Sequence, residues 1–187
     1  GQPVIRRYYD RVHNNGRTEI SGLPEADRDE GWIAERQYEV LRAIAEVVIE
    51  IGWDAPVTVG HCCSLSVQDE ARALSTLDLV AQAGINVVSL PMCNLYLQDR
   101  QAHRTPRGRG ITLVHEMRAR GINVSFASDN TRDPFYAYGD MDMVEVMRMA
   151  TRIGHLDHSE PDWPLAFSRN PTQACSFPLP SLAPGAP

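Results

Sequence analysis

The chain has 187 residues, 43% hydrophobic and 22% charged, which is an ordinary composition for a soluble protein able to bury one core. Its formal net charge is −6. This argues against binding of nucleic acid or of an anionic membrane surface, because both need a basic stripe. No window approaches the roughly 18 apolar residues of a membrane span. We therefore expect a cytoplasmic protein with no nucleic-acid and no membrane partner.

The four cysteines do not form a recognisable metal or disulfide pattern. Cys62 and Cys63 are adjacent, Cys93 and Cys175 are isolated, and no Cys-x-x-Cys pair occurs. This spacing disfavours a zinc ribbon and gives little support to a secreted disulfide framework. We expect free, partly buried thiols.

The N-terminal part changes character near residue 32. Residues 1–31 are polar and are interrupted by Asn-Gly, Ser-Gly and Leu-Pro pairs, which predicts an irregular segment. From Trp32 onward, apolar residues recur at helical spacing up to Gly52. The β-branched run 57–60 follows Pro56 and predicts a short buried strand.

The alternation of helix and strand then continues along the chain. Glycines 84 and 121 close two of the helical patterns, and Pro91 stops one strand pattern. The predicted helices are 67–83, 111–120 and 141–153, the predicted strands are 86–90 and 122–127, and the predicted loops are 93–109 and 128–139. The last thirty residues are rich in proline and lose periodicity, so they are predicted to be irregular.

Short apolar strands alternating with helices indicate parallel βα units and an α/β fold. A complete (β/α)8 barrel needs roughly 250 residues. We therefore predict a partial TIM-type barrel of about three to four βα units over residues 32–157, preceded by an irregular segment 1–31 and followed by a Pro-rich irregular tail 158–187.

Reactive groups gather at the carboxyl ends of parallel strands, where the βα loops converge. His61 and Cys62 follow the first predicted strand, Asn94 and Gln98 the second, and Asp129 the third. A histidine and an aspartate at two such ends suit activation of a metal-bound water or general acid–base catalysis. The alternative is that His61 is a hydrogen-bonded structural residue.

Residues 57 to about 157 resemble the C-terminal half of the cytosine deaminase branch of the amidohydrolase superfamily. The matching stretches are 57–61, 84–88, 91–98, 109–112, 121–124 and 128–135. The resemblance implies a hydrolase that cleaves a C–N bond of a cyclic amidine or amide, with a small nitrogen heterocycle such as a cytosine-like ring as substrate. It also implies a divalent metal, iron or zinc.

The resemblance assigns roles to several residues of this chain. His61 falls on the histidine that positions the metal-bound water, and Asp129 on the aspartate that binds the metal and takes a proton from that water. Asn130 stands where cytosine deaminases tend to have a second aspartate near the substrate, which leaves room for a ring other than cytosine. Phe135 falls on an aromatic position that would pack over a planar substrate, with a loop anchor as the alternative.

Other expected groups are absent or uncertain in position. No His-x-His pair occurs in the chain, and Asp27 stands where the resemblance expects a fifth-strand histidine. Glu30 would then be the proton shuttle to the ring nitrogen, with a solvated acidic turn as the alternative. His61 and Asp129 alone are too few ligands for a tight site, so whether this chain retains the metal stays open. The alternatives to a truncated enzyme are an inactive remnant and an interaction module that oligomerises through open sheet edges.

Overall fold

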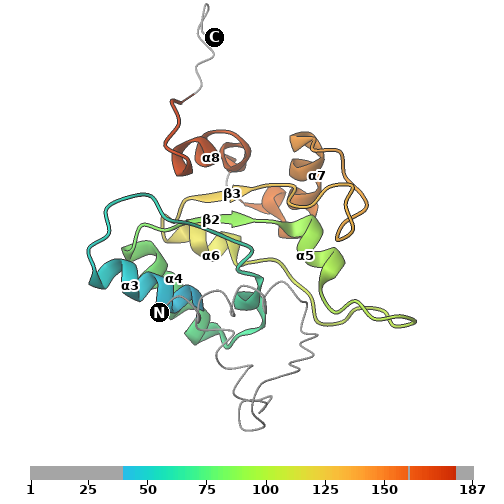
Figure 1. Ribbon diagram of the computed structural model, residues 1–187, viewed down its shortest axis with the longest axis horizontal. Coiled ribbons are helices and arrows are strands. Elements are labelled where there is room, and N and C mark those ends of the chain that lie inside the picture. The colour runs from blue at the N-terminus through green and yellow to red at the C-terminus, as the bar shows by residue number, and fades with distance from the viewer. Residues whose placement is uncertain (1–39, 160, 180–187) are drawn as a thin grey trace, which may run out of the picture.

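A three-stranded parallel sheet lies at the centre of the computed structural model, which describes residues 40–159 and 161–179 (Figure 1). Its strands are β1 (Thr58–Gly60), β2 (Asn86–Ser89) and β3 (Val124–Phe126), in the order β1-β2-β3. Both neighbouring pairs are parallel. The predicted α/β fold with parallel βα units is therefore confirmed, and all three predicted strands are present with slightly shorter bounds.

Helices connect the strands and follow the last one. The longer helices are α3 (Val40–Glu50), α4 (Glu70–Gln82) and α7 (Met143–Gly154). The shorter helical segments are η2 (Cys63–Val67), α5 (Pro91–Leu97), α6 (Val114–Ala119), η3 (Leu156–His158), η4 (Trp163–Phe167) and α8 (Arg169–Ala174). No helix in these described ranges is long and apolar enough to cross a membrane.

Local sequence signals account for the ends of the main helices. Asp69 caps α4 by accepting a hydrogen bond from the Arg72 N–H at 3.1 Å, and Asp142 caps α7 in the same way through Val144 N–H at 2.8 Å. Each satisfies a backbone donor that the first helical turn leaves unpaired. After α4, Gly84 has φ +65°, a left-handed conformation that glycine adopts without steric cost.

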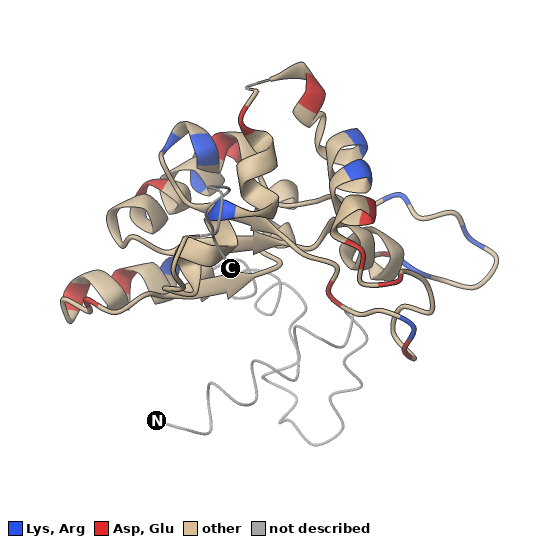
Figure 2. Ribbon diagram, turned by 90° about the horizontal axis from the view of Figure 1, so that it is seen from above, with Lys and Arg blue, Asp and Glu red and all other residues tan. Residues whose placement is uncertain are grey.

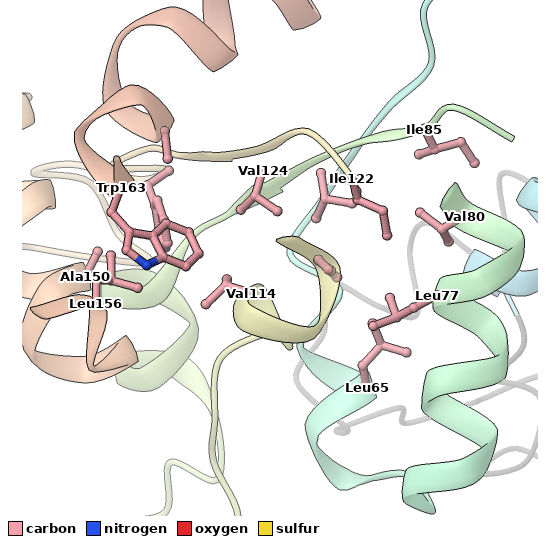
Figure 3. Close-up of a cluster of buried hydrophobic side chains, with 14 of the residues drawn as sticks. Leu65, Leu77, Val80, Ile85, Val114, Ile122, Val124, Ala150, Leu156 and Trp163 are labelled. Atoms are coloured by element: carbon pink, nitrogen blue, oxygen red, sulfur yellow. The ribbon is translucent and has the colours of Figure 1, made fainter. Parts of the chain in front are cut away.

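One face of the sheet carries the core. Val59, Val87 and Val124 are register partners, so their side chains point to the same face. Val87 and Leu77 of α4 are fully buried. Figure 3 shows Val124 in one continuous apolar cluster with side chains from α4, α6, α7 and η4. Burial of this face at about 25 cal/mol per Å² drives the helices onto the sheet.

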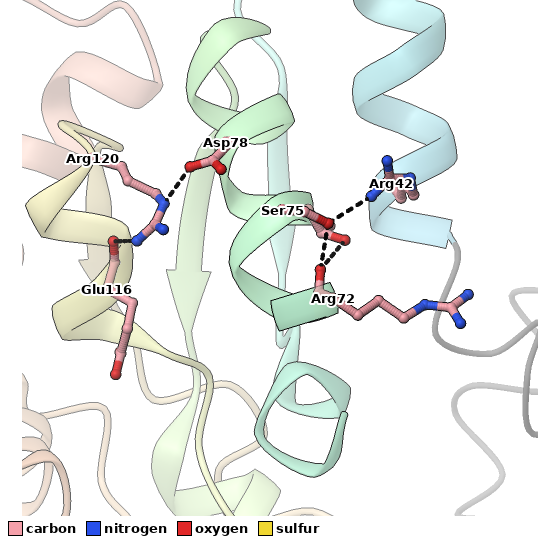
Figure 4. A network of polar contacts seen from close by, with 7 residues as sticks. Arg42, Arg72, Ser75, Asp78, Glu116 and Arg120 are labelled. Carbon is pink, nitrogen blue, oxygen red and sulfur yellow. Dashed lines mark hydrogen bonds and ion pairs between the residues drawn. The ribbon is translucent and has the colours of Figure 1, made fainter. Parts of the chain in front are cut away.

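Polar contacts join the helices on their outer side (Figure 4). Arg120 Nε, just after α6, lies 2.7 Å from Asp78 Oδ1 of α4, and Arg42 Nη1 of α3 donates to Ser75 Oγ of α4 at 3.1 Å. The Asp78 side chain is 67% exposed, so solvent screens this ion pair and its contribution to stability is small. These contacts fix the relative orientation of α3, α4 and α6 more than they stabilise the fold.

Three asparagines bridge the amino ends of the strands. Asn86 Nδ2 donates to Val57 O at 3.0 Å, and Asn123 Nδ2 donates to Asn86 Oδ1 at 2.8 Å and to Asn170 O at 3.1 Å. Asn170 Nδ2 of α8 donates to Val124 O at 2.8 Å. Because Asn123 O faces β2 and carbonyls alternate along a strand, Val124 O points to the free edge of β3. Asn170 therefore pairs a carbonyl of that edge.

The loop prediction for residues 93–109 is wrong in its first part. Residues Pro91–Leu97 form α5, whose N-terminal residues are buried. Pro91 was expected to stop the strand, which it does, but proline also suits the first turn of a helix because its missing N–H is not needed there.

The irregular tail predicted from residue 158 is also wrong, because η4 and α8 are helical and pack on the sheet. Trp163 is 4% exposed, and the Phe167 ring stacks on Phe126 of β3 with centroids 4.9 Å apart. The prolines here do not prevent helices, since Pro164 occupies the first turn of η4. The predicted segment 1–31 lies outside the described residues.

Candidate active site at the carboxyl ends of the strands

Two of the predicted site residues follow strands in the same unusual backbone conformation. His61, after β1, has φ +66°, and Asp129, after β3, has φ +64°. Positive φ is uncommon outside glycine, although His and Asp are enriched in it, and such conformations cluster at functional sites. Both residues lie at the carboxyl edge of one parallel sheet. β1 and β3 have β2 between them, and two strands separated by a third lie about 10 Å apart.

The imidazole of His61 is oriented by Asn94 of α5. Asn94 Nδ2 lies 2.8 Å from His61 Nδ1, and Asn94 is 8% exposed. An amide nitrogen only donates, so Nδ1 accepts and the neutral imidazole carries its proton on Nε2. The backbone N–H of His61 also donates to Val88 O of β2 at 3.0 Å. The sequence predicted only a loop-shaping role for Asn94.

Cys93 holds the loop after β3 against α5. Its Sγ lies 3.4 Å from Ser128 O and 3.3 Å from Asn130 O, the carbonyls on either side of Asp129. Burial, together with the nearby Asp129 carboxylate, raises the pKa of the Cys93 thiol to about 12. Because Asn94 contacts His61 and Cys93 contacts the loop at Asp129, α5 joins the two strand ends that carry the predicted catalytic pair.

The loop after Asp129 is organised around the carboxylate of Asp133. Its Oδ2 accepts from Asn130 Nδ2 at 2.5 Å, and its Oδ1 accepts from the backbone N–H groups of Phe135 and Tyr136, both at 2.9 Å. The pKa of Asp133 is lowered, mainly by the hydrogen bond from Asn130. An aspartate two to three residues before two backbone donors is a typical turn signal, and it could have identified Asp133 from the sequence.

Aromatic side chains gather beside this loop. Tyr96 of α5 meets Tyr136 and Tyr138 edge to face, with centroids 5.2 and 5.5 Å apart, and the Arg100 guanidinium lies 4.9 Å from the Tyr96 ring centroid. Phe135 is 58% exposed. The ring is thus not packed as a loop anchor, and its contact with a planar ligand stays a prediction.

The long loop between α5 and α6 carries four arginines, at positions 100, 104, 107 and 109, and Figure 2 shows basic segments along it. Gln98 and Gly110 close its base through two hydrogen bonds, Nε2 to O at 3.0 Å and N to Oε1 at 2.7 Å. A Cβ at Gly110 would lie 2.8 Å from Ser66 Oγ, which explains the glycine. Asp99 accepts from the backbone N–H groups of Arg107 and Gly108 and pairs with Arg104.

The residues that the structure describes do not complete a metal centre. Between residues 40 and 179, apart from position 160, no three His, Cys, Asp or Glu side chains are grouped so that they could hold a metal ion. Protein sites for catalytic metals normally use three or more ligands. The described donors therefore do not fit a divalent metal by themselves. Glu30, the predicted proton shuttle, lies outside the described residues.

A family model and two groups of known proteins match this chain. The model described as "Amidohydrolase family" matches residues 33–186. One curated relative is a pterin deaminase of Rhizobium rhizogenes strain K84, 61% identical over 124 residues, which are 66% of this chain and 28% of that protein.

Solved structures match as well. The 5-methylcytosine deaminase of Klebsiella pneumoniae, solved with 5-fluorocytosine, aligns with a TM-score of 0.65 and 32% identity over 73% of this chain and 33% of that one. The N-isopropylammelide isopropylaminohydrolase of Burkholderia multivorans aligns with a TM-score of 0.56 and 24% identity over 75% of this chain and 33% of that one, which supports the fold alone.

The parallel βα units and the polar groups at their carboxyl ends define part of a barrel-type hydrolase. The chain belongs to the amidohydrolase family. The predicted cytosine deaminase-like resemblance and partial TIM-type barrel are confirmed. The family match reaches residue 186, so it includes the tail that the sequence pattern had set apart. The chain spans about a third or less of the lengths of the relatives it matches.

Proposed function

We propose that this chain forms part of the active site of a hydrolytic deaminase that acts on a ring carbon bearing an amino group, with a pterin-like ring as the substrate. The observation that carries the proposal is the 61% identity to a pterin deaminase over 124 residues, 66% of this chain. A cytosine-like ring is the second substrate class, supported by the likeness to 5-methylcytosine deaminase at 32% identity. Both rings are cyclic amidines, the substrate class that the family resemblance implies.

In the proposed reaction, water adds to the ring carbon that carries the amino group. A C–O bond forms, the C–N bond to the amino group breaks and ammonia leaves, while the ring keeps a carbonyl with the second proton of the water on the adjacent ring nitrogen. The carboxylate of Asp129 is the proposed proton acceptor for the attacking water, and it can return that proton to the leaving nitrogen. Such positioned proton transfer contributes typically 10²–10⁴-fold to a rate.

We assign His61 the task of holding the water, because Asn94 of α5 orients its imidazole through Nδ1 at the carboxyl end of β1. Asn130 and the exposed ring of Phe135 are the proposed contacts to the substrate ring. The proton-shuttle role of Glu30 stays a prediction.

Members of the amidohydrolase family generally use a divalent metal. Asp129 as a ligand for iron or zinc stays a prediction, because the part of the chain that the structure describes offers no group of three ligands. The steps proposed here therefore use only proton transfer, orientation and stacking by this chain's own residues.

Ammonia release from pterin and from cytosine tests the proposal directly. Asp129→Asn should abolish ammonia release from the preferred ring, since an amide cannot take the proton. Asp157→Asn is the matched control, because this exposed carboxylate lies after α7 and its nearest charged partner is His158 at 3.9 Å. Absence of ammonia release from every ring by the unaltered chain, with or without added iron or zinc, would overturn the enzyme proposal.

One observation supports the alternative of an interaction module. Val47, Ile51 and Trp53, in and after α3, are 51%, 62% and 54% exposed, and apolar side chains grouped on a surface favour association. A homo-oligomer formed on this side should elute earlier than a monomer in size-exclusion chromatography with light scattering. Trp53→Glu should then shift the protein to the monomer position, and a monomer at all concentrations would exclude this alternative.

A further inference from the structure

The orientation of the Asn130 side chain is determined by the chemistry of its partner. Asp133 accepts three hydrogen bonds, from Asn130 Nδ2 and from the backbone N–H groups of Phe135 and Tyr136. An ionised carboxylate has no proton to donate. Only the NH₂ end of the Asn130 carboxamide can therefore face Asp133, and the assignment does not depend on telling nitrogen from oxygen by shape.

The other end of the carboxamide is left as an acceptor. Within residues 40–159 and 161–179, Oδ1 of Asn130 takes part in no hydrogen bond, while the backbone carbonyl of the same residue is bonded to Cys93 Sγ at 3.3 Å. The residue is thus held at its backbone and at its NH₂ group. Its side-chain oxygen is therefore an open acceptor, and the second N–H of the NH₂ group is an open donor beside it.

We propose that Asp133 is a positioning residue that presents the carboxamide oxygen of Asn130 to the substrate, so that the ring must offer an N–H donor at that point. This inference rests on the proposed function, in which Asn130 contacts the ring. Asp133 fixes which end of the amide is the acceptor: Oδ1 is turned away from the carboxylate, while the NH₂ group is committed to Asp133 through one of its two N–H groups. A ring with an amino group or a ring N–H opposite Asn130 is bound, and a ring with a carbonyl or an unprotonated nitrogen there is disfavoured because two acceptors would meet.

The substitution Asp133→Asn changes one atom and should invert this polarity. Oδ1 of residue 133 must stay an acceptor, because two backbone N–H groups point at it. The new NH₂ group would then replace Oδ2 and face the NH₂ group of Asn130. Two donors repel, so the Asn130 carboxamide should rotate by half a turn and present its NH₂ group instead. The loop keeps its backbone hydrogen bonds, so the variant isolates polarity from folding.

Nuclear magnetic resonance of the Asn130 side-chain amide tests the clamp without any need for turnover. In the unaltered chain, these resonances should shift as Asp133 is protonated, with a midpoint below the ordinary value of 3.8. In Asp133→Asn the shift should vanish and both amide protons should exchange faster with water. Asp140→Asn, a carboxylate of the same loop that accepts from Asp142 N, should leave the titration unchanged. An Asn130 amide that does not respond to pH in the unaltered chain overturns the clamp, and this arm needs no variant.

Steady-state kinetics test the substrate side. Asp133→Asn should raise KM for the preferred ring about tenfold with kcat within about twofold, as expected when one hydrogen bond of ordinary strength is lost in binding. Asp140→Asn should change neither. Suppose that Asp133→Asn abolishes the pH-dependent shift of the Asn130 amide resonances and yet leaves KM unchanged. In that case Asn130 does not present an acceptor to the ring, and the specificity claim is wrong. If the unaltered chain turns over no ring, the proposed function fails, whereas the clamp is decided separately by the spectrum.

Discussion

The two outer strands of the sheet lie in different surroundings. Every residue of β3 is buried, and η4, α7 and α8 pack against it. Thr58 and Gly60 of β1 are exposed, and the segment that leads into β1 carries Ile51 and Trp53, both more than half exposed. The difference teaches that this chain completes the core on the β3 side with its own C-terminal helices, whereas the β1 side keeps apolar surface that a neighbouring element could cover.

Thiol reactivity should show that Cys62, which follows the exposed Gly60 and is partly buried, is nevertheless protected in the folded chain. Burial raises the pKa of Cys62 to about 12, as burial and Asp129 do for Cys93, against an ordinary value of 9.0. At a fixed pH, this rise in pKa lowers the fraction of thiolate roughly a thousandfold, and the thiolate is the species that reacts. Labelling with iodoacetamide at pH 8, followed by mass spectrometry, should modify the exposed Cys175 first and these two only after unfolding in urea. Rapid labelling of Cys62 would contradict this division.

Truncation of one ring on the β3 side should cost far more stability than truncation on the β1 side. Phe126 is 2% exposed and stacks on Phe167, so Phe126→Ala should lower the free energy of unfolding by about 3–5 kcal/mol. Ile51→Ala removes a side chain that is 62% exposed and should change it by about 0.5 kcal/mol or less. Urea denaturation of both variants measures their free energies of unfolding. Equal losses in the two variants would show that the β3 side is not the better-packed side of the sheet.

The cap on the β3 edge should have an intermediate effect. Asn170→Ala leaves Val124 O without its side-chain donor, which should cost about 1–2 kcal/mol. Gln173→Ala, at an exposed position of the same helix, is the control and should be close to neutral. A neutral Asn170→Ala would mean that water replaces the amide and that the edge is less protected than its contacts indicate.

Acid should weaken the loop after β3 through Asp133, with the smallest effect of the four. The pKa of Asp133 is lowered in the folded chain, mainly by Asn130. Its contribution to stability is therefore present above the unfolded value of 3.8 and is lost as pH falls through the lower folded value. Urea midpoints measured from pH 5 to pH 2 should fall less steeply in Asp133→Asn than in the unaltered chain. Parallel curves for the two proteins would exclude this contribution.

The sequence could predict the βα alternation because its signals are local. β-branched runs marked the strands, and Gly84 and Gly121, both with positive φ, marked helix ends. The helices α5, η4 and α8 were missed because proline was taken as a breaker. Pro91 and Pro164 instead stand in the first turns of helices. The rings of Trp163 and Phe126 contact each other across 37 positions of sequence, and no local pattern reveals such a contact.

The candidate site divides in the same way. His61 and Asp129 were predicted because residues just past parallel strands share one edge. The contacts that orient them were not predicted, since Asn94 reaches His61 across 33 positions and Cys93 reaches Asn130 across 37. Such pairs depend on how α5 sits between β1 and β3. Their residue types also have ordinary structural uses, so only the folded arrangement distinguishes them.

The hydrogen bond from Asn170 to Val124 makes the two edges of the sheet unequal as growth points. A strand that joined β3 would have to displace the side chain of Asn170, 46 positions away, from Val124 O, whereas at the free edge of β1 the competing donor is local, with the Cys62 N–H on Gly60 O at 3.0 Å. Head-to-tail stacking of copies, β1 of one on β3 of the next, is therefore opposed at every junction, and an open fibre of this chain is disfavoured. A two-fold pairing of β1 with β1 would leave the Asn170 contact intact and would end with the dimer.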